Sequence, residues 1–185
     1  MTGRLILIKH AMPRIEEGVP SKDWLLSDEG RVAARRLADQ LRGFELAALV
    51  ASPEPKALET GQIIAGELGL VCSVDADLIE TRRESVGWMS RDAIEAGIQR
   101  FFDEPADLVF GEETADDAHA RFTAAIARHR LADRTVVVVC HGTVISLFVS
   151  RLTGAEPMAI WRLQGLPHAL VLGADGEVAE SIAVS

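Results

Sequence analysis

The chain has 185 residues, 25% of them charged, and a net charge of −9, which is typical of a single globular domain over residues 1–185. It has no basic stripe to replace the counterions of a nucleic acid and no apolar run long enough to span a membrane, so both partners are excluded. Two cysteines, Cys72 and Cys140, are too few for a disulfide framework. The N-terminus does not resemble a signal peptide, so we expect a cytoplasmic location.

The first half of the chain alternates strand-like runs with segments of helical spacing. Residues 5–8 form a continuous apolar run of the kind found in strands buried on both faces. Ser27 is expected to cap a helix that reaches about Gly43. The further elements predicted here are a strand at 46–51, a helix with Ser52 as N-cap and Pro53 as first position that ends at Gly69, and a strand at 71–74.

The second half continues the alternation and ends in two strands. The predicted elements are a helix at about 90–102, a helix that starts at Thr114, a strand at 135–139, a helix at about 142–152, and strands at 169–172 and 178–184. The Asp175-Gly176 pair between the last two predicts a hairpin and an antiparallel edge strand. The whole pattern indicates an α/β fold with a mainly parallel sheet.

Negative charge is concentrated between Ala76 and Asp117, a segment that contains twelve Asp and Glu residues but only four Arg residues. One interpretation is a solvated surface. The other is an acidic lid or cap at about 76–113, beside an active site, that disfavours highly anionic substrates.

Two histidines follow predicted core strands. His10 comes after the run 5–8 and Lys9, and His141 comes after the run 136–139 and Cys140. Because ligand sites in open α/β sheets lie at the carboxyl ends of strands, we expect His10 and His141 to meet there and to serve catalysis. Cys140, at the end of a buried strand, is expected to be a small core residue rather than a catalytic thiol.

Cations and a helix start accompany these histidines. Lys9 would attract an oxyanion, and Gly142 lies at the start of a helix, where free backbone N–H groups suit anions. Lys56 lies near a helix N-terminus, where the helix dipole disfavours a cation. It is therefore expected to bind phosphate; the alternatives are extension into solvent and an ion pair with Glu59.

At this point the sequence resembles the histidine phosphatase superfamily, which includes the cofactor-dependent phosphoglycerate mutases. Five segments carry the resemblance, in the family's order: Leu7-Ile8-Lys9-His10, the helix start at 24–31, Ser52-Pro53-x-x-Lys56-Ala57-x-Glu59-Thr60, Gly111-Glu112, and Val139-Cys140-His141-Gly142. They cover most of the chain. The resemblance implies a three-layer sandwich of the phosphoglycerate mutase type.

The resemblance also implies roles for these residues. His10 would be the nucleophile that forms a phosphohistidine, and His141 would bind the phosphoryl oxygens. Lys9 and Lys56 stand where the family has arginines that clamp the phosphate, and the backbone of Gly142 completes the phosphate site. No metal and no cofactor are implied, because the cations and the helix start supply the positive charge.

A proton donor for the leaving oxygen is expected after a Leu-x-Glu pattern in the mutase-like branch. Leu78-Ile79-Glu80 fits that pattern, and Glu84 is the runner-up. Arg82 and Arg83 follow directly and are candidates for substrate binding, against the alternative of a surface charge cluster. His168 is a further candidate at the pocket rim, against the alternative of a buried structural residue.

The chain departs from the family at both signature arginines, which are lysines, and at Ala11, where the family has glycine. Lysine keeps the charge but loses the planar two-pronged grip on phosphate. The segments expected of a true mutase are missing. The sequence therefore predicts a phosphomonoester hydrolase acting on a phosphorylated small molecule, ahead of a phosphoprotein. The alternatives are a weakly active or non-catalytic phosphate-binding protein of the same fold and, with no supporting ligand spacing, a metal-dependent hydrolase.

Overall fold

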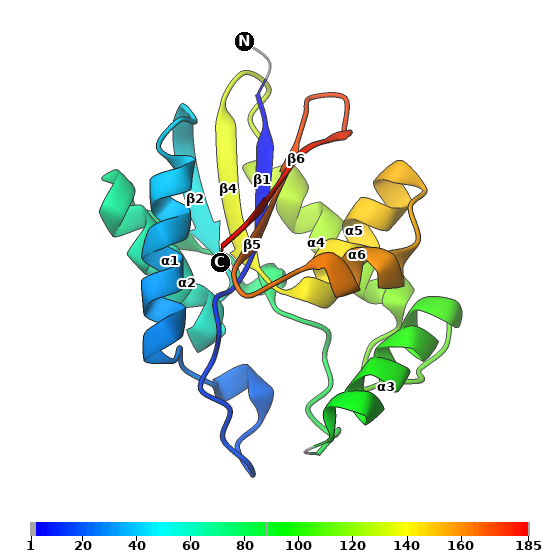
Figure 1. The fold of residues 1–185 in the computed structure, drawn as a ribbon. Coiled ribbons are helices and arrows are strands. Elements are labelled where there is room, and N and C mark those ends of the chain that lie inside the picture. The colour runs from blue at the N-terminus through cyan, green and yellow to red at the C-terminus, as the bar shows by residue number, and fades with distance from the viewer. Residues whose placement is uncertain (1–2, 88, 185) are drawn as a thin grey trace.

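A six-stranded sheet forms the centre of the computed structural model, which describes residues 3–87 and 89–184 (Figure 1). The strands are β1 (Leu5–Lys9), β2 (Leu46–Ala51), β3 (Cys72–Val74), β4 (Thr135–Cys140), β5 (His168–Leu172) and β6 (Val178–Ala183). Their order is β3-β2-β4-β1-β5-β6, with the first four parallel and β5 antiparallel to both β1 and β6. The predicted mainly parallel sheet and the hairpin around Asp175-Gly176 are confirmed.

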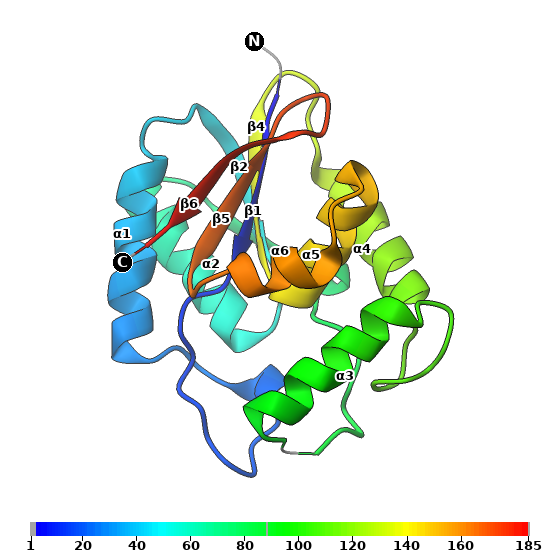
Figure 2. The same ribbon diagram turned by 45° about the vertical axis from the view of Figure 1, so that its right-hand side comes forward.

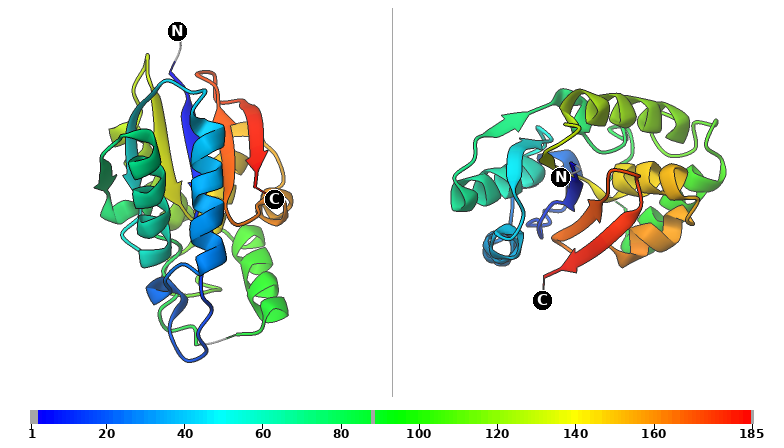
Figure 3. Two further views of the ribbon diagram at one scale, coloured as in Figure 1. Left: turned by 60° about the vertical axis from the view of Figure 1, so that its left-hand side comes forward. Right: turned by 90° about the horizontal axis from the view of Figure 1, so that it is seen from above.

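Helices cover both faces of this sheet and complete a three-layer sandwich (Figures 2 and 3). One face carries α1 (Asp28–Leu41) and α2 (Pro55–Leu68), and the other carries α4 (Ala115–His129), α5 (Gly142–Thr153) and α6 (Pro157–Leu163). The side chains of β1 point alternately to the two faces of the sheet, and they pack against the helices on both sides. Leu5 and Leu7 pack in the cluster that contains Phe122 of α4, whereas Ile6 and Ile8 pack in the cluster that contains Leu37 of α1.

The helix α3 (Arg91–Asp103) lies beyond the carboxyl ends of β1, β2 and β4 (Figure 1). The helix predicted at about 90–102 is confirmed, and Ser90 caps it by accepting a hydrogen bond from the N–H of Ala93. Phe101 and Phe102 pack in a cluster that also contains residues of α4, α5 and α6. This part of the acidic segment 76–113 is therefore packed against the helices of one face of the sheet; residue 88 lies outside the described residues.

The sequence-based boundaries need three corrections. The helix α2 has Glu54 as N-cap and Pro55 in its first turn, because the hydroxyl of Ser52 bonds His141 instead of capping a helix. The short helix α6 was not predicted. His168 is the first residue of β5 rather than a residue preceding it. Among the described helices, none combines the length and the apolar character that crossing a bilayer requires.

Candidate active site

Adjacent parallel strands bring His10 and His141 together. The strands β1 and β4 pair in register up to Lys9 and Cys140, so the residue that follows each strand reaches the same edge of the sheet. The two imidazole centroids are 5.3 Å apart, with the rings at 63°. The sequence-based expectation that these histidines meet is confirmed.

The surroundings of His10 fix both its charge and its tautomer. Its Nδ1 lies 2.8 Å from the carbonyl oxygen of Ala11, which can only accept, so Nδ1 carries the hydrogen and Nε2 keeps its lone pair. Burial, followed by the nearby His141 and Lys56, lowers the pKa of His10 well below its usual 6.5. At neutral pH the His10 ring is therefore an uncharged base with a free Nε2.

His141 is fully buried and serves as the N-cap residue of α5. Its Nε2 lies 2.8 Å from Ser52 Oγ, and its Nδ1 has no hydrogen-bond partner among the described residues. Burial, and then the positive charge of Lys56, lowers the pKa of His141 well below 6.5. This ring too is neutral, with one nitrogen left for a ligand.

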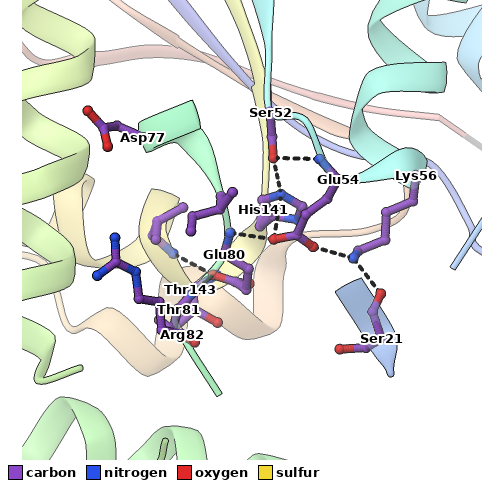
Figure 4. Close-up of polar contacts among 12 residues, drawn as sticks. Ser21, Ser52, Glu54, Lys56, Asp77, Glu80, Thr81, Arg82, His141 and Thr143 are labelled. Carbon is purple, nitrogen blue, oxygen red and sulfur yellow. Dashed lines mark hydrogen bonds and ion pairs between the residues drawn. The ribbon is translucent and has the colours of Figure 1, made fainter. Parts of the chain in front are cut away.

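Lys56 is buried near His141, and two oxygen atoms hold its ammonium group (Figure 4). Its ammonium donates to a carboxylate oxygen of Glu54 at 2.6 Å and to the carbonyl oxygen of Ser21 at 2.6 Å. Glu59, the alternative partner considered above, instead accepts from Arg31 at 2.6 Å. The position of Lys56 beside the histidines agrees with a role in anion binding, and its partner is a different glutamate from the one considered.

Glu54 is a site residue that the sequence analysis missed. Its Oε1 accepts from the backbone N–H of Glu80 at 2.8 Å and lies 3.5 Å from His141 Nε2, so the carboxylate lies between His141 and Lys56 (Figure 4). The sequence did contain a sign of this role: Glu54 lies two positions before Lys56 at a helix start, where the two side chains can form an ion pair with each other.

Lys9, the other predicted phosphate-binding cation, lies beside the first turn of α5. Its ammonium donates to the carbonyl oxygen of Gln164 at 3.1 Å and lies 5.8 Å from the centre of the Trp161 ring. A Cβ at Gly142 would lie 3.2 Å from Lys9 Cε, so glycine leaves room for this stem beside the first turn of α5. Burial lowers the pKa of Lys9, against the opposing effect of Glu80.

Glu80 occupies the N-terminus of α5. Its two carboxylate oxygens accept from the backbone N–H groups of Thr143 at 3.1 Å and Val144 at 3.2 Å. The backbone oxygen of Glu80 accepts from Arg121, which also forms a buried ion pair with Glu113 at 2.6 Å. The predicted proton donor is thus held firmly within the histidine site.

A cavity of about 340 Å³ opens next to these residues. Two segments, 18–24 and 79–94, supply most of its lining, together with Glu54 and Phe110. Among the described residues neither histidine lines this space, whereas Glu54 and Glu80 belong to both the cavity and the histidine cluster. The histidine site and this cavity therefore share one boundary, formed by the two glutamates.

The segment-based resemblance is borne out by comparison with known proteins. The profile of the histidine phosphatase superfamily (branch 1) matches residues 5–174. The chain belongs to this superfamily. Comparison with curated protein sequences gives no match.

Solved structures of phosphatases share the superfamily fold with this chain. A mycobacterial glucosyl-3-phosphoglycerate phosphatase in complex with VO3 has a TM-score of 0.71 at 25% identity, with 92% of each chain covered. A phosphoserine phosphatase from Entamoeba histolytica in complex with 3-phosphoglyceric acid has a TM-score of 0.73 at 18% identity, with 98% of each chain covered. A phosphohistidine phosphatase from Agrobacterium tumefaciens, described as putative in its own name, has a TM-score of 0.63 at 14% identity, with 98% of each chain covered.

The remaining candidate residues lie in different surroundings. Arg82 and Arg83 line the cavity, and so does Glu84, which pairs with Lys22 at 2.9 Å. His168 is buried on β5, where its Nε2 lies 2.9 Å from Ser181 Oγ of β6.

Cys140 lies in the core of the histidine phosphatase fold, and burial raises the pKa of its thiol, which agrees with the expected structural role. Within residues 3–87 and 89–184, no three side chains of the His, Cys, Asp or Glu type are grouped so as to hold a metal ion.

Proposed function

We propose that this protein hydrolyses a phosphomonoester of a small molecule through a phosphohistidine formed on His10. The observation that carries the proposal is the state of His10, which is buried, neutral and oriented by Ala11, with Nε2 free to attack. The phosphatase activities named for structural relatives from mycobacteria and Entamoeba histolytica support the same class of reaction.

The reaction takes two in-line steps. In the first, Glu80 enters in its protonated form, having taken a proton from solvent; His10 Nε2 forms a bond to phosphorus, the bond from phosphorus to the ester oxygen breaks, and the departing alcohol takes the proton of Glu80. In the second, water forms a bond to phosphorus and returns a proton to Glu80 while the phosphorus–nitrogen bond breaks. The Nδ1–H group of His10 keeps its bond to Ala11 throughout, which stabilises the positive charge on the ring.

His141 supplies a hydrogen-bond donor to the phosphoryl group. Ser52 Oγ accepts from the backbone N–H of Glu54 at 3.3 Å, so its own hydrogen is available to His141 Nε2. The proton of the neutral His141 ring then lies on Nδ1, which is the nitrogen without a partner. Donation from this nitrogen favours the charge that develops on the phosphoryl oxygens.

Carboxylates hold the anion-binding groups until substrate arrives. Glu54 accepts a hydrogen bond from Lys56, and Glu80 accepts hydrogen bonds from the backbone N–H groups of Thr143 and Val144. A phosphoryl group that reaches Lys56 replaces the Glu54 contact, while Lys9 and the backbone of Gly142, which lie next to each other, supply further groups that suit an anion.

The Glu54–Lys56 pair also favours a second candidate function. A chain whose cation is already neutralised binds phosphate weakly and turns it over slowly, which describes a weakly active or non-catalytic phosphate-binding member of the superfamily. The two functions differ in whether His10 is needed for turnover.

The test is phosphate release from an aryl phosphate by the unmodified protein, by His10→Ala and by a control, His119→Gln, which replaces a half-buried histidine on α4. The proposed function predicts that His10→Ala lowers kcat/KM by about a thousandfold or more, since the covalent path is lost, and that His119→Gln stays close to the unmodified protein. Equal rates for the unmodified protein and His10→Ala contradict the proposal.

A further inference from the structure

The cavity beside the two glutamates has mostly apolar walls. Trp24 comes from the loop that contains η1 (Ser21–Asp23), Val86 and Met89 come from the segment before α3, and Ile94 and Phe110 come from α3 and the turn that follows it. A volume of about 340 Å³ suits the organic part of a small ligand rather than a single phosphate group. Such walls favour an apolar group over a hydroxyl-rich one, because hydroxyls buried against them would lose hydrogen bonds to water.

Most charged side chains that line this space already have partners. Glu54 holds Lys56, Glu80 holds the α5 N-terminus, and Glu84 pairs with Lys22. Arg83 differs from them. Its guanidinium lies 5.5 Å from the centre of the Phe110 ring, and its Nη1 is buried with no hydrogen-bond partner among the described residues.

A second polar group on the same segment is also unsatisfied. Thr81 is only 5% exposed, lines the cavity, and has a buried Oγ1 without a hydrogen-bond partner in the described part of the chain. Buried polar groups in folded proteins are nearly always satisfied, by protein, water or ligand. Arg83 and Thr81 both line the cavity, and each carries a polar atom that a ligand can satisfy; together they favour a polar, preferentially anionic, ligand group.

The wall that carries Arg83 is held in place by the Gly111-Glu112 element. The backbone N–H of Glu112 donates to the carbonyl oxygen of Arg82 at 2.7 Å, and the Glu112 carboxylate accepts from the N–H groups of Glu84 and Ser85. Gly111 has φ +109°, and a Cβ there would lie 2.2 Å from the oxygen of Arg82, so only glycine fits. The guanidinium is thus presented by a braced turn rather than by a free loop.

We propose that the cavity binds the alcohol part of the substrate, and that this part is an apolar, ring-sized group bearing a carboxylate which Arg83 and Thr81 bind. The inference rests on the proposed function, because it places the phosphoryl group at His10 and His141 and the rest of the same molecule beyond Glu54 and Glu80. The carboxylate bonds Nη1 of Arg83, the ring packs on Trp24 and Phe110, and the ester oxygen lies next to Glu80.

The test is binding of three phosphonates, measured by titration calorimetry: methylphosphonate, benzylphosphonate and 4-carboxybenzylphosphonate. Phosphonates have no ester oxygen to lose, so this readout does not depend on turnover. In the unmodified protein, benzylphosphonate is expected to bind about tenfold more tightly than methylphosphonate, through burial of the ring. The added carboxylate is expected to contribute about another tenfold through a charged hydrogen bond.

Arg83→Met should remove the gain from the carboxylate and keep most of the gain from the ring. Arg100→Met, which takes the same charge from an exposed residue of α3 outside the cavity lining, should keep both gains. Equal affinity for the methyl and benzyl ligands, absence of binding by all three, or a carboxylate gain that persists in Arg83→Met overturns the inference. The comparison of the three ligands in the unmodified protein needs no variant. It therefore still tests the inference if Arg83→Met folds poorly. Failure of the proposed function itself is seen separately, in the phosphate-release assay with His10→Ala.

Discussion

The histidine site and the cavity beside it are built in different ways. His10 and His141 follow two paired strands, so the register of the sheet sets their separation, and burial keeps both rings neutral. The cavity wall is made by turns from distant parts of the chain, braced by Glu112, and it carries an arginine with an unused donor. The sheet therefore sets the positions of the two histidines, whereas the turns set the shape and charge of the cavity that would select the substrate.

The sharpest contrast between the two regions lies in their ion pairs. Lys56 and Glu54 are buried in the histidine site, whereas Lys22 and Glu84 are exposed at the cavity. Lys56→Met leaves a buried carboxylate without its cation and is expected to lower the free energy of unfolding by about 3–5 kcal/mol. Lys22→Met removes a screened surface pair and should have a small effect.

Urea denaturation of both variants measures this difference. The double variant Glu54→Gln/Lys56→Met should recover much of the lost stability, because no unpaired charge remains. Equal losses for Lys56→Met and Lys22→Met would show that the Glu54–Lys56 pair is not the buried unit described above.

Removal of the donor on His141 tests the chemical half of the comparison. We expect His141→Gln to lower kcat for an aryl phosphate by about a hundredfold to a thousandfold, since the amide nitrogen of glutamine takes the place of Nε2 and the phosphoryl oxygens lose the donor at Nδ1. The matched control is His168→Gln, which replaces another buried imidazole, one that is bonded to Ser181. A similar loss of kcat in both variants would contradict a specific role for His141.

Glu54→Gln tests whether Glu54, at the boundary between the two regions, competes with phosphate for Lys56 or holds Lys56 in position. The variant removes the negative charge beside Lys56 without a change in size, so vanadate is expected to bind about tenfold more tightly. Glu84→Gln takes the same charge from the cavity rim and should change the affinity by less than about twofold. Weaker vanadate binding by Glu54→Gln would identify Glu54 as a residue that positions Lys56 rather than one that competes with phosphate.

The pKa shifts of the histidines predict how stability depends on pH. The pKa values of His10 and His141 lie well below 6.5 in the folded protein, so below pH 6.5 the unfolded chain binds protons that the folded chain does not. The free energy of unfolding should therefore fall as the pH drops from about 6.5 to 5, by up to about 1.4 kcal/mol per pH unit for each such histidine.

Urea titrations at several pH values check this dependence. His141→Gln removes one of the titrating rings, so its stability should change less steeply over the same range. A slope as steep as that of the unmodified protein would show that the charge state assigned to His141 is wrong.

The parts of this protein that follow local patterns were predictable from sequence. Continuous apolar runs placed β1 and β4, and the residues directly after them led to His10 and His141, because the ends of parallel strands share one edge of the sheet. The Asp175-Gly176 turn likewise led to the β5–β6 hairpin, because its conformation depends on its own residues.

The parts that depend on tertiary contacts were not predictable. The start of α2 was predicted two residues too early. Ser52 is a residue type that often caps helices, but here the fold places its hydroxyl next to His141 and the two form a hydrogen bond. The contact of Lys56 with the carbonyl oxygen of Ser21 was missed because Ser21 belongs to η1, which is distant in the sequence. The cavity and the free donor of Arg83 arise only when the segments 18–24 and 79–94 come together.

The most direct test of the account is a search for the covalent intermediate. The protein would be mixed with an aryl phosphate, quenched in alkali within the first turnover, digested, and its phosphorylated peptides mapped by mass spectrometry. The account predicts phosphate on His10 in the unmodified protein and no labelled peptide in His10→Ala. Turnover without a phosphohistidine, or a label on another residue, would contradict it.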